Sequence, residues 1–301
     1  MLSGPVDIDG DGPVKPVKHL DEAWGKKYPG FVTCQRGRGE DPGEYAGKRK
    51  LDNKCCQVHL TTEPLRHRER KLVDQFLIEL EPSISLARLK RYQSPTGDDL
   101  ETAVNYLWNV ALAESLFCSL NAVEIALRNA LHGTLTNHFG VPAWYERPGL
   151  LEIKQARDIT AVKKRIREYG DPITPDRAVS ELTFGFWVVI LSRPYDARLW
   201  QGQNAAPLKN AFMRIPRQER QRQTIHQQYT SIRELRNRVF HYEPVFNDQH
   251  LAQRYGQIKH GLRWLNPRMV DCLEWYDRFP DVYHNGRTRV ESKLKAELGI
   301  A

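Results

Sequence analysis

The chain has 301 residues, of which 40% are apolar, enough for one large domain or two modest ones with a packed core. A formal net charge of +8 favours anionic partners such as nucleic acid, and five cysteines do not suit a disulfide framework in so long a chain. No secretory signal is visible, and the longest nearly apolar run, 182–191, is about half of a spanning helix. We therefore expect a soluble, cytoplasmic protein without membrane contact.

Residues 1–65 have the composition of a flexible leader. They hold 9 of the 20 glycines and 6 of the 18 prolines and show no sustained helix or strand period. The "DIDGDG" at 7–12 begins like a calcium loop but has Lys18 where the bidentate glutamate belongs. The four potential zinc ligands of the leader lack the paired spacing of a zinc site: Cys34, Cys55, Cys56 and His59. We expect neither a metal nor a cofactor.

From residue 66 onward the apolar residues recur at helical spacing, and strand alternation is missing. This pattern predicts an all-α fold, with one domain over 66–265 and a helical extension over 266–301 that packs on it. Thr174 is expected to cap a helix that has Pro175 in its first position. The expected helices are 68–82, ending at Pro82, then 83–94, 97–140 as two helices, 150–169, 175–192, 205–214, 217–241, 248–265, 268–278 and 288–298.

The stretch "RELRNRVFHYEP" at 233–244 places a charge where an apolar residue is expected. On the predicted helix Arg236 lies in the middle of an apolar stripe formed by Ile225, Tyr229, Ile232 and Val239. A guanidinium in such a stripe is costly unless it is paired or faces a ligand. It therefore either forms an ion pair with a carboxylate of another helix or serves as a phosphate clamp.

His241 follows Arg236 by five positions, which on a regular helix places it about 140° away around the axis. The two side chains can converge only if the helix ends near His241, and Pro244 disfavours helical geometry at Glu243. Asn237 can hydrogen-bond to either group or to the backbone at the helix end. A histidine at a helix end also serves as a C-terminal cap, so both interpretations remain.

A second polar stripe is predicted on the helix before residue 140. Asn121, Glu124, Arg128 and His132 recur at spacings of three, four and four, which places them on one helix face. This stripe is either a solvated helix edge or an auxiliary wall of a pocket. In the second case Glu124 is able to orient Arg236 or His241.

Basic residues gather around the same stretch. From residue 214 to 241 there are seven arginines and two glutamates, a local balance of 7 − 2 = +5. Such a surface attracts a phosphodiester backbone without reading its sequence, although a solvated helix face has the same composition. The residues expected to bind an RNA backbone are Arg222, Arg233 and Arg238. Glycine-rich phosphate loops, H-E-x-x-H and G-x-S-x-G are absent from the sequence, which removes the most recognisable ATPase, dehydrogenase, zinc protease and hydrolase signatures.

The motif "LRNRVFH" resembles the signature of HEPN domains, an Arg and a His separated by four to six residues. The runs "NYLWNVALAESLFCSLNAVEIALRNALH", "ELTFGFWVVILSRPYDARLW" and "IRELRNRVFHYEP" resemble the Abi-like (abortive infection) branch of that superfamily, over about 70–265. Arg236 and His241 match the signature, and Asn237 matches the polar residue that often follows the Arg. The resemblance implies a HEPN-type helical bundle that forms a homodimer through its motif helices and cleaves RNA without a metal in phage defence or toxin–antitoxin systems.

The chemistry that the resemblance implies is attack of the RNA 2′-hydroxyl on the adjacent phosphorus, which leaves a 2′,3′-cyclic phosphate. His241 would transfer the proton, and Arg236 would stabilise the charge on the phosphorane oxygens. RNA, a second copy of the chain and an antitoxin or other regulator are the expected partners. The rival hypotheses are a noncatalytic RNA- or nucleotide-binding module and a helical interaction domain with a buried Arg/His network.

Overall fold

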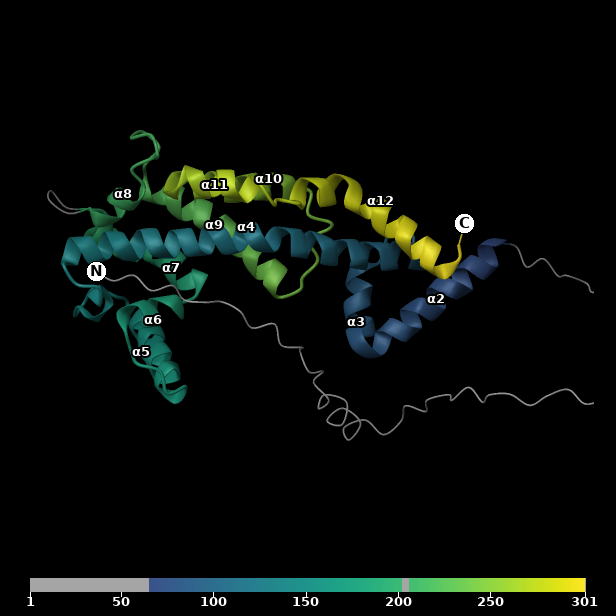
Figure 1. Ribbon diagram of the computed structural model, residues 1–301, viewed down its shortest axis with the longest axis horizontal. Helices are drawn as coiled ribbons and strands as arrows, with labels where there is room; N and C mark the ends of the chain where they lie inside the picture. Colours follow the sequence, from purple (N-terminus) through teal and green to yellow (C-terminus); the bar gives the residue numbers. More distant parts are fainter. Residues whose placement is uncertain (1–64, 202–205, 301) are drawn as a thin grey trace, which may run out of the picture. The chain divides into compact units, whose positions relative to one another are not determined.

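The computed structural model describes residues 65–201 and 206–300, and every regular element in these ranges is a helix (Figure 1). The expected all-α fold is therefore confirmed for the described part of the chain. The predictions on residues 1–64, including the calcium-like and zinc-like residues, lie outside the described ranges.

The α-helices follow one another with short connections that include 3₁₀ and π turns. Their bounds are α2 (Leu65–Ile84), α3 (Leu86–Leu89), α4 (Asp99–Phe139), α5 (Ile153–Glu168), α6 (Pro175–Ser180), α7 (Phe184–Ile190), α8 (Pro207–Ala211), α9 (Arg222–Phe240), α10 (Leu251–Leu265), α11 (Pro267–Glu274) and α12 (Phe279–Leu298). The shorter turns are η1 (Lys90–Tyr92), η2 (Trp144–Glu146), η3 (Arg193–Tyr195) and η4 (Asp196–Trp200).

Helix α4 is one continuous helix of 41 residues, so the expectation of two helices over 97–140 was wrong. The Asp98 side chain caps its first turn by accepting from the backbone N–H groups of Leu100 (2.8 Å) and Glu101 (3.3 Å). Gly140 ends it with φ 72°. Within the described ranges seven other helices pack along α4, namely α2 and α7 to α12. Tertiary packing along much of its length, rather than local sequence, therefore stabilises this long helix.

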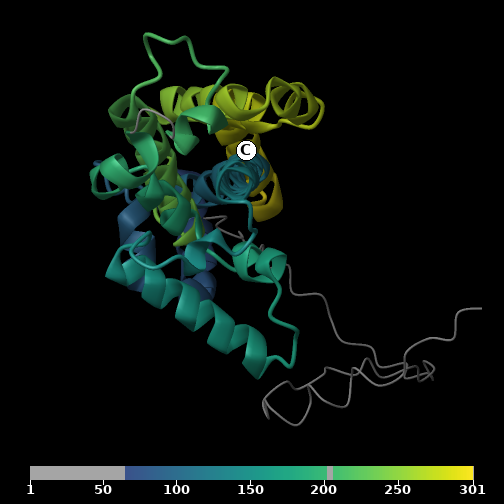
Figure 2. The same ribbon diagram turned by 90° about the vertical axis from the view of Figure 1, so that its left-hand side faces the viewer.

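Figure 2 shows α4 close to end-on, with α10 and α5 on opposite sides of it. By length and composition α4 is apolar enough to cross a membrane, a test that the core helix of a soluble protein also passes. Its leucines form part of the main core: Leu112, Leu116, Leu120, Leu127, Leu131 and Leu135. Burial in the core thus accounts for much of the apolar content of α4, and the absence of membrane contact stays a prediction.

Several other helix boundaries differ from expectation, among them the start of α9, which is at Arg222 instead of 217. Helix α2 continues past Pro82 to Ile84 and ends where Ser85 adopts φ 70°. The expected helix over 175–192 is two helices, because the Thr183 side chain accepts from the N–H of Phe186 and starts α7 anew. The predicted cap at Thr174 is confirmed, with Arg177 N–H as donor at 3.2 Å. Helix α12 begins at Phe279, well before the expected residue 288.

The C-terminal helices α11 and α12 pack on the core that precedes them. The Trp108 Nε1–H of α4 donates to the carbonyl of Val282 at 3.0 Å, and Leu273 and Phe279 are buried in the main core. On α12, Leu294 forms a smaller cluster with residues from the start of α4. The described residues of this segment, 266–300, therefore contact the helices that precede them, and the division at residue 265 stays a prediction.

Helices α9 and α10 approach each other at Gly261. The Tyr229 hydroxyl donates to the Gly261 carbonyl at 2.9 Å, and a Cβ at position 261 would lie 3.0 Å from Ile232 Cδ1. We expect Gly261→Ala to lower the free energy of unfolding by about 1–2 kcal/mol despite the better helix propensity of alanine. The matched control is Gly256→Ala on the same helix, where nothing lies within 4 Å and a gain of up to about 1 kcal/mol is expected. Urea unfolding of both variants checks this, and equal effects would refute the close approach.

Candidate functional site

Arg236 of α9 lies beside Glu124 of α4. The ion-pair interpretation of the sequence required such a carboxylate on another helix. The Nε of Arg236 is 3.4 Å from Glu124 Oε2, and its guanidinium lies over the Phe240 ring, 4.2 Å from the centroid. The side chains of Arg236 and Glu124 are 26% and 21% exposed, so the pair is half-buried and open on one side. The buried Nε has no aligned hydrogen bond within the protein. The contact is therefore an attraction between charges that leaves a buried donor unsatisfied.

His241 caps the end of α9, as expected from Pro244. Its backbone N–H donates to the Asn237 carbonyl at 2.9 Å, and the next two N–H groups donate to Val239 (3.1 Å) and Arg238 (2.8 Å). This is the hydrogen-bond pattern of a helix that ends in a left-handed residue. Among the described residues the exposed His241 imidazole has no hydrogen bond or ion pair, so it is free to meet a ligand.

Tyr242 is the left-handed residue of this helix end. It has φ 57°, is 69% exposed, and its ring contacts the Arg88 guanidinium at 5.7 Å. Glycine is the usual residue at such a position, and a tyrosine there costs of order 1 kcal/mol or more. Tyr242 and Phe240 were not among the residues predicted to belong to the site. The feature of the sequence that could have indicated them is that they are aromatic and flank His241.

Of the second polar stripe, the structure joins only Glu124 to Arg236. Arg128 does not pair with Glu124 but donates from Nη1 to the Ser180 carbonyl at 3.4 Å. Asn121 and Asn237 are exposed; Asn121 lies three residues before Glu124 on the same face of α4, whereas Asn237 directly follows Arg236 and lies about 100° away around α9. The assignment of these asparagines to the site remains a prediction.

His132 belongs to the tryptophan-rich core rather than to the Arg236 contact. Its Nδ1 accepts a hydrogen bond from Trp144 Nε1 at 3.0 Å, and its Nε2 lies 3.9 Å from the exposed Asp176. Burial lowers the pKa of His132 below its usual 6.5; Asp176 opposes this shift, and Arg128 adds to it. The neutral imidazole is the form that the folded state favours.

The lowered pKa of His132 predicts a pH-dependent stability. The unfolded chain binds the proton more tightly, so this contribution is fully present above pH 6.5 and is lost as the pH falls through the folded pKa below 6.5. We expect the free energy of unfolding of the wild type to fall more between pH 7.5 and 5.5 than that of His132→Asn, in which an amide oxygen replaces Nδ1 as acceptor. Chemical unfolding at both pH values measures the difference. Parallel pH profiles would contradict it.

The three arginines expected to bind an RNA backbone have different surroundings. Arg222 Nε is 2.5 Å from Asp196, and Arg238 Nη1 is 2.7 Å from Asp248. Arg233 has no ion-pair partner within the described ranges and faces a hollow beside α5. Arg222 and Arg238 therefore stabilise neighbouring segments through ion pairs, and Arg233 is the member of the three that is available to an external anion.

Asn109 of α4 holds the segment that follows His241, a role that the sequence analysis missed. Its side-chain oxygen accepts from the backbone N–H groups of Val245 (2.6 Å) and Phe246 (3.1 Å). Its amide donates to the Tyr92 hydroxyl at 3.3 Å, and Asn109 is 4% exposed. The end of the motif is thus fixed to the central helix by a buried amide.

Within the described part of the chain, no group of three or more His, Cys, Asp or Glu side chains could hold a metal ion. The residues around α9 instead offer a half-buried guanidinium, an exposed imidazole and an exposed amide. No known family model matches the chain, and neither a curated protein nor a solved structure matches it.

Proposed function

We propose that the protein is a metal-independent endoribonuclease of the HEPN type, similar to Abi-like proteins of phage defence or toxin–antitoxin systems. One observation carries the proposal: at the end of α9 a partly exposed Arg236 and an exposed His241, which has no partner among the described residues, belong to one short motif. A guanidinium that is partly exposed suits a phosphate, and an exposed imidazole suits proton transfer.

The proposed reaction uses the RNA itself as nucleophile. The 2′-hydroxyl oxygen forms a bond to the adjacent phosphorus while His241 accepts its proton, and the bond to the 5′-oxygen breaks to leave a 2′,3′-cyclic phosphate. Arg236 stabilises the negative charge that develops on the phosphorane oxygens. Glu124 and Phe240 position Arg236, and Asn237 is able to donate to the phosphate.

We further propose a homodimer through the motif helices, which would supply a second His241 as the acid for the leaving oxygen. An apolar surface beside the motif supports this arrangement. Phe117 of α4 is 49% exposed and stacks on Phe240 of α9 at 5.5 Å, and Val110 of α4 is also 49% exposed. Exposed aromatic residues next to charged ones are typical of interfaces. An antitoxin or other regulator is a second proposed partner.

The contacts of Arg236 also favour one alternative in part. Its pairing with Glu124 and Phe240 is what a structural network requires, whereas His241 has no contact of that kind. A noncatalytic RNA- or nucleotide-binding module would use the same two side chains only to hold its ligand.

Incubation of the purified protein with total RNA in EDTA tests the proposal. We expect cleavage by the wild type, products with a 2′,3′-cyclic phosphate, and loss of cleavage in Arg236→Ala and His241→Ala. Equal cleavage by all three proteins would remove these residues from catalysis. RNA binding without cleavage would favour the noncatalytic module, and a monomeric mass in solution would argue against the shared dimeric site.

A further inference from the structure

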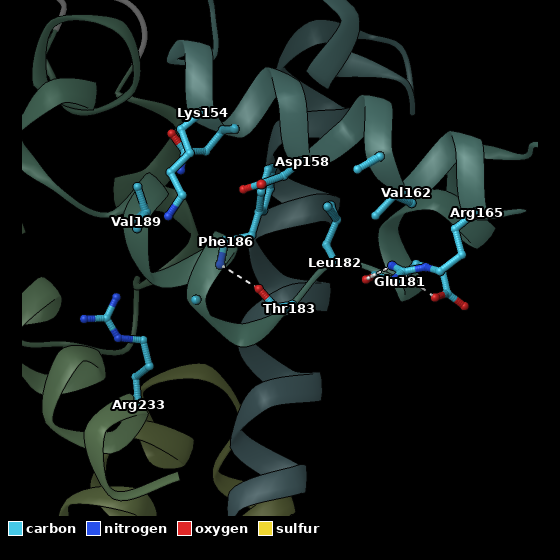
Figure 3. A pocket seen from close by; sticks show the side chains of 13 residues that line it. Lys154, Asp158, Val162, Arg165, Glu181, Leu182, Thr183, Phe186, Val189 and Arg233 are labelled. Atoms are coloured by element: carbon cyan, nitrogen blue, oxygen red, sulfur yellow. Dashed lines mark hydrogen bonds and ion pairs between the residues drawn. The ribbon is translucent and has the colours of Figure 1, made fainter. Parts of the chain in front are cut away.

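A hollow of about 340 Å³ lies between α5 and α7 and is bordered by Arg233 of α9 (Figure 3). Its volume is within the range of small-molecule sites, roughly 300–1,000 Å³. Its apolar walls are formed by Val162, Leu182, Phe186 and Val189, and neither Arg236 nor His241 lines it. The hollow is therefore a separate place from the proposed reaction centre, although both use α9.

The charges of the hollow are not balanced internally. Arg165 is paired with Glu181 at 3.5 Å. Lys154 and Arg233 have no ion-pair partner within 4.0 Å among the described residues, and in Figure 3 they extend toward the same open side from α5 and α9. Asp158 lies on α5 one turn after Lys154 and borders the hollow as an acceptor. Two free cations, one carboxylate and apolar walls together form an amphipathic site.

We propose that this hollow binds one nucleotide unit, with its phosphate between Lys154 and Arg233. Both cations can donate to phosphate oxygens, and the planar Arg233 fork suits two of them. The apolar walls contact the base and sugar, while Asp158 accepts a hydrogen bond from a base amino group or a hydroxyl. An acidic peptide would leave the apolar walls without a partner, and an apolar ligand would leave the cations without one.

The nucleotide is either free in solution or part of an RNA strand. Arg233 precedes Arg236 by three residues on α9, about 4.5 Å along the helix axis and on a neighbouring face. An RNA strand held at Arg236 would therefore pass close to Arg233, which borders the hollow. The strand-bound case rests on the proposed function, whereas the free-nucleotide case does not.

Fluorescence anisotropy of the full chain tests the site with a labelled 2′-O-methyl oligoadenylate decamer, which cannot be cleaved by 2′-hydroxyl attack but keeps the base amino groups, and with labelled AMP. We expect Lys154→Gln and Arg233→Gln each to weaken binding about tenfold. Ala161→Trp is expected to weaken it similarly, because an exposed residue at the rim would fill the hollow without removing a charge. The matched control is Arg157→Gln, an exposed arginine of α5 outside the hollow, with binding within about twofold of the wild type.

The two probes separate the sources of the nucleotide. Loss of AMP binding in the hollow variants assigns a free nucleotide, and loss confined to the decamer assigns the RNA strand. The proposal is overturned if the wild type binds neither probe, or if the double variant of Lys154 and Arg233 binds as tightly as Arg157→Gln. Circular dichroism verifies that each variant is folded. If a charge variant misfolds, Ala161→Trp still tests the site, because it retains every charge. If natural RNA stays intact while decamer binding still depends on Lys154 and Arg233, the ribonuclease proposal fails, but the proposal that the hollow binds a nucleotide is supported.

Discussion

His241→Ala is expected to slow RNA cleavage by about 10²–10⁴-fold, the usual contribution of a positioned acid or base. The same change should leave the free energy of unfolding within about 0.5 kcal/mol of the wild type, because the imidazole is exposed and has no partner among the described residues. The loss of rate is thus expected without a loss of structure. Cleavage of a labelled RNA, with urea unfolding of the same preparations, measures both quantities.

Arg236→Ala is the informative comparison, because its two effects should coincide. The change removes the charge that stabilises the phosphorane and also leaves the half-buried Glu124 without its cation. We expect a similar loss of rate together with a loss of about 1–2 kcal/mol of stability, reduced from the value of a fully buried pair because both side chains are partly exposed. Glu124→Gln in the Arg236→Ala background should recover stability but not cleavage. Recovery of cleavage there would contradict a direct role for Arg236.

Asn109→Ala should destabilise the protein by about 2–4 kcal/mol, which is large for a single polar side chain. The variant leaves the N–H groups of Val245 and Phe246 without their acceptor in a buried place and removes the donor to the Tyr92 hydroxyl. The segment after His241 would then lose its attachment to α4, so cleavage should fall as well.

Urea unfolding measures the effect of Asn109→Ala, and hydrogen exchange of the 244–246 amides locates it. Asn121→Ala on the same helix is the matched control, because Asn121 is exposed, and its effect should stay within about 0.5 kcal/mol. A small effect of Asn109→Ala with unchanged exchange at 244–246 would show that the buried amide does not hold this segment.

Local features of the sequence predicted much of the helical fold. The cap at Thr174, the end of α9 before Pro244 and the all-helical pattern follow from interactions within a few residues. The continuous α4 was not predictable in this way, because its length depends on helices that are distant in the chain and pack around it. The division into α6 and α7 was not predicted, although the cap at Thr183 that causes it is a local feature of the sequence.

Some features of the candidate site likewise follow from local sequence, and others depend on tertiary contacts. The position of Arg236 in an apolar stripe and the end of the helix beside His241 could be predicted from local sequence, since they follow from helical periodicity and from Pro244. The packing of α9 against α4 brings Glu124 beside Arg236, whereas Arg128 and His132 have other partners, and neither outcome follows from the sequence alone. It likewise separated Arg233 from the paired Arg222 and Arg238. The physical reason is that a charge pattern shows which groups a helix carries, while the partner of each group depends on distances between segments far apart in the chain.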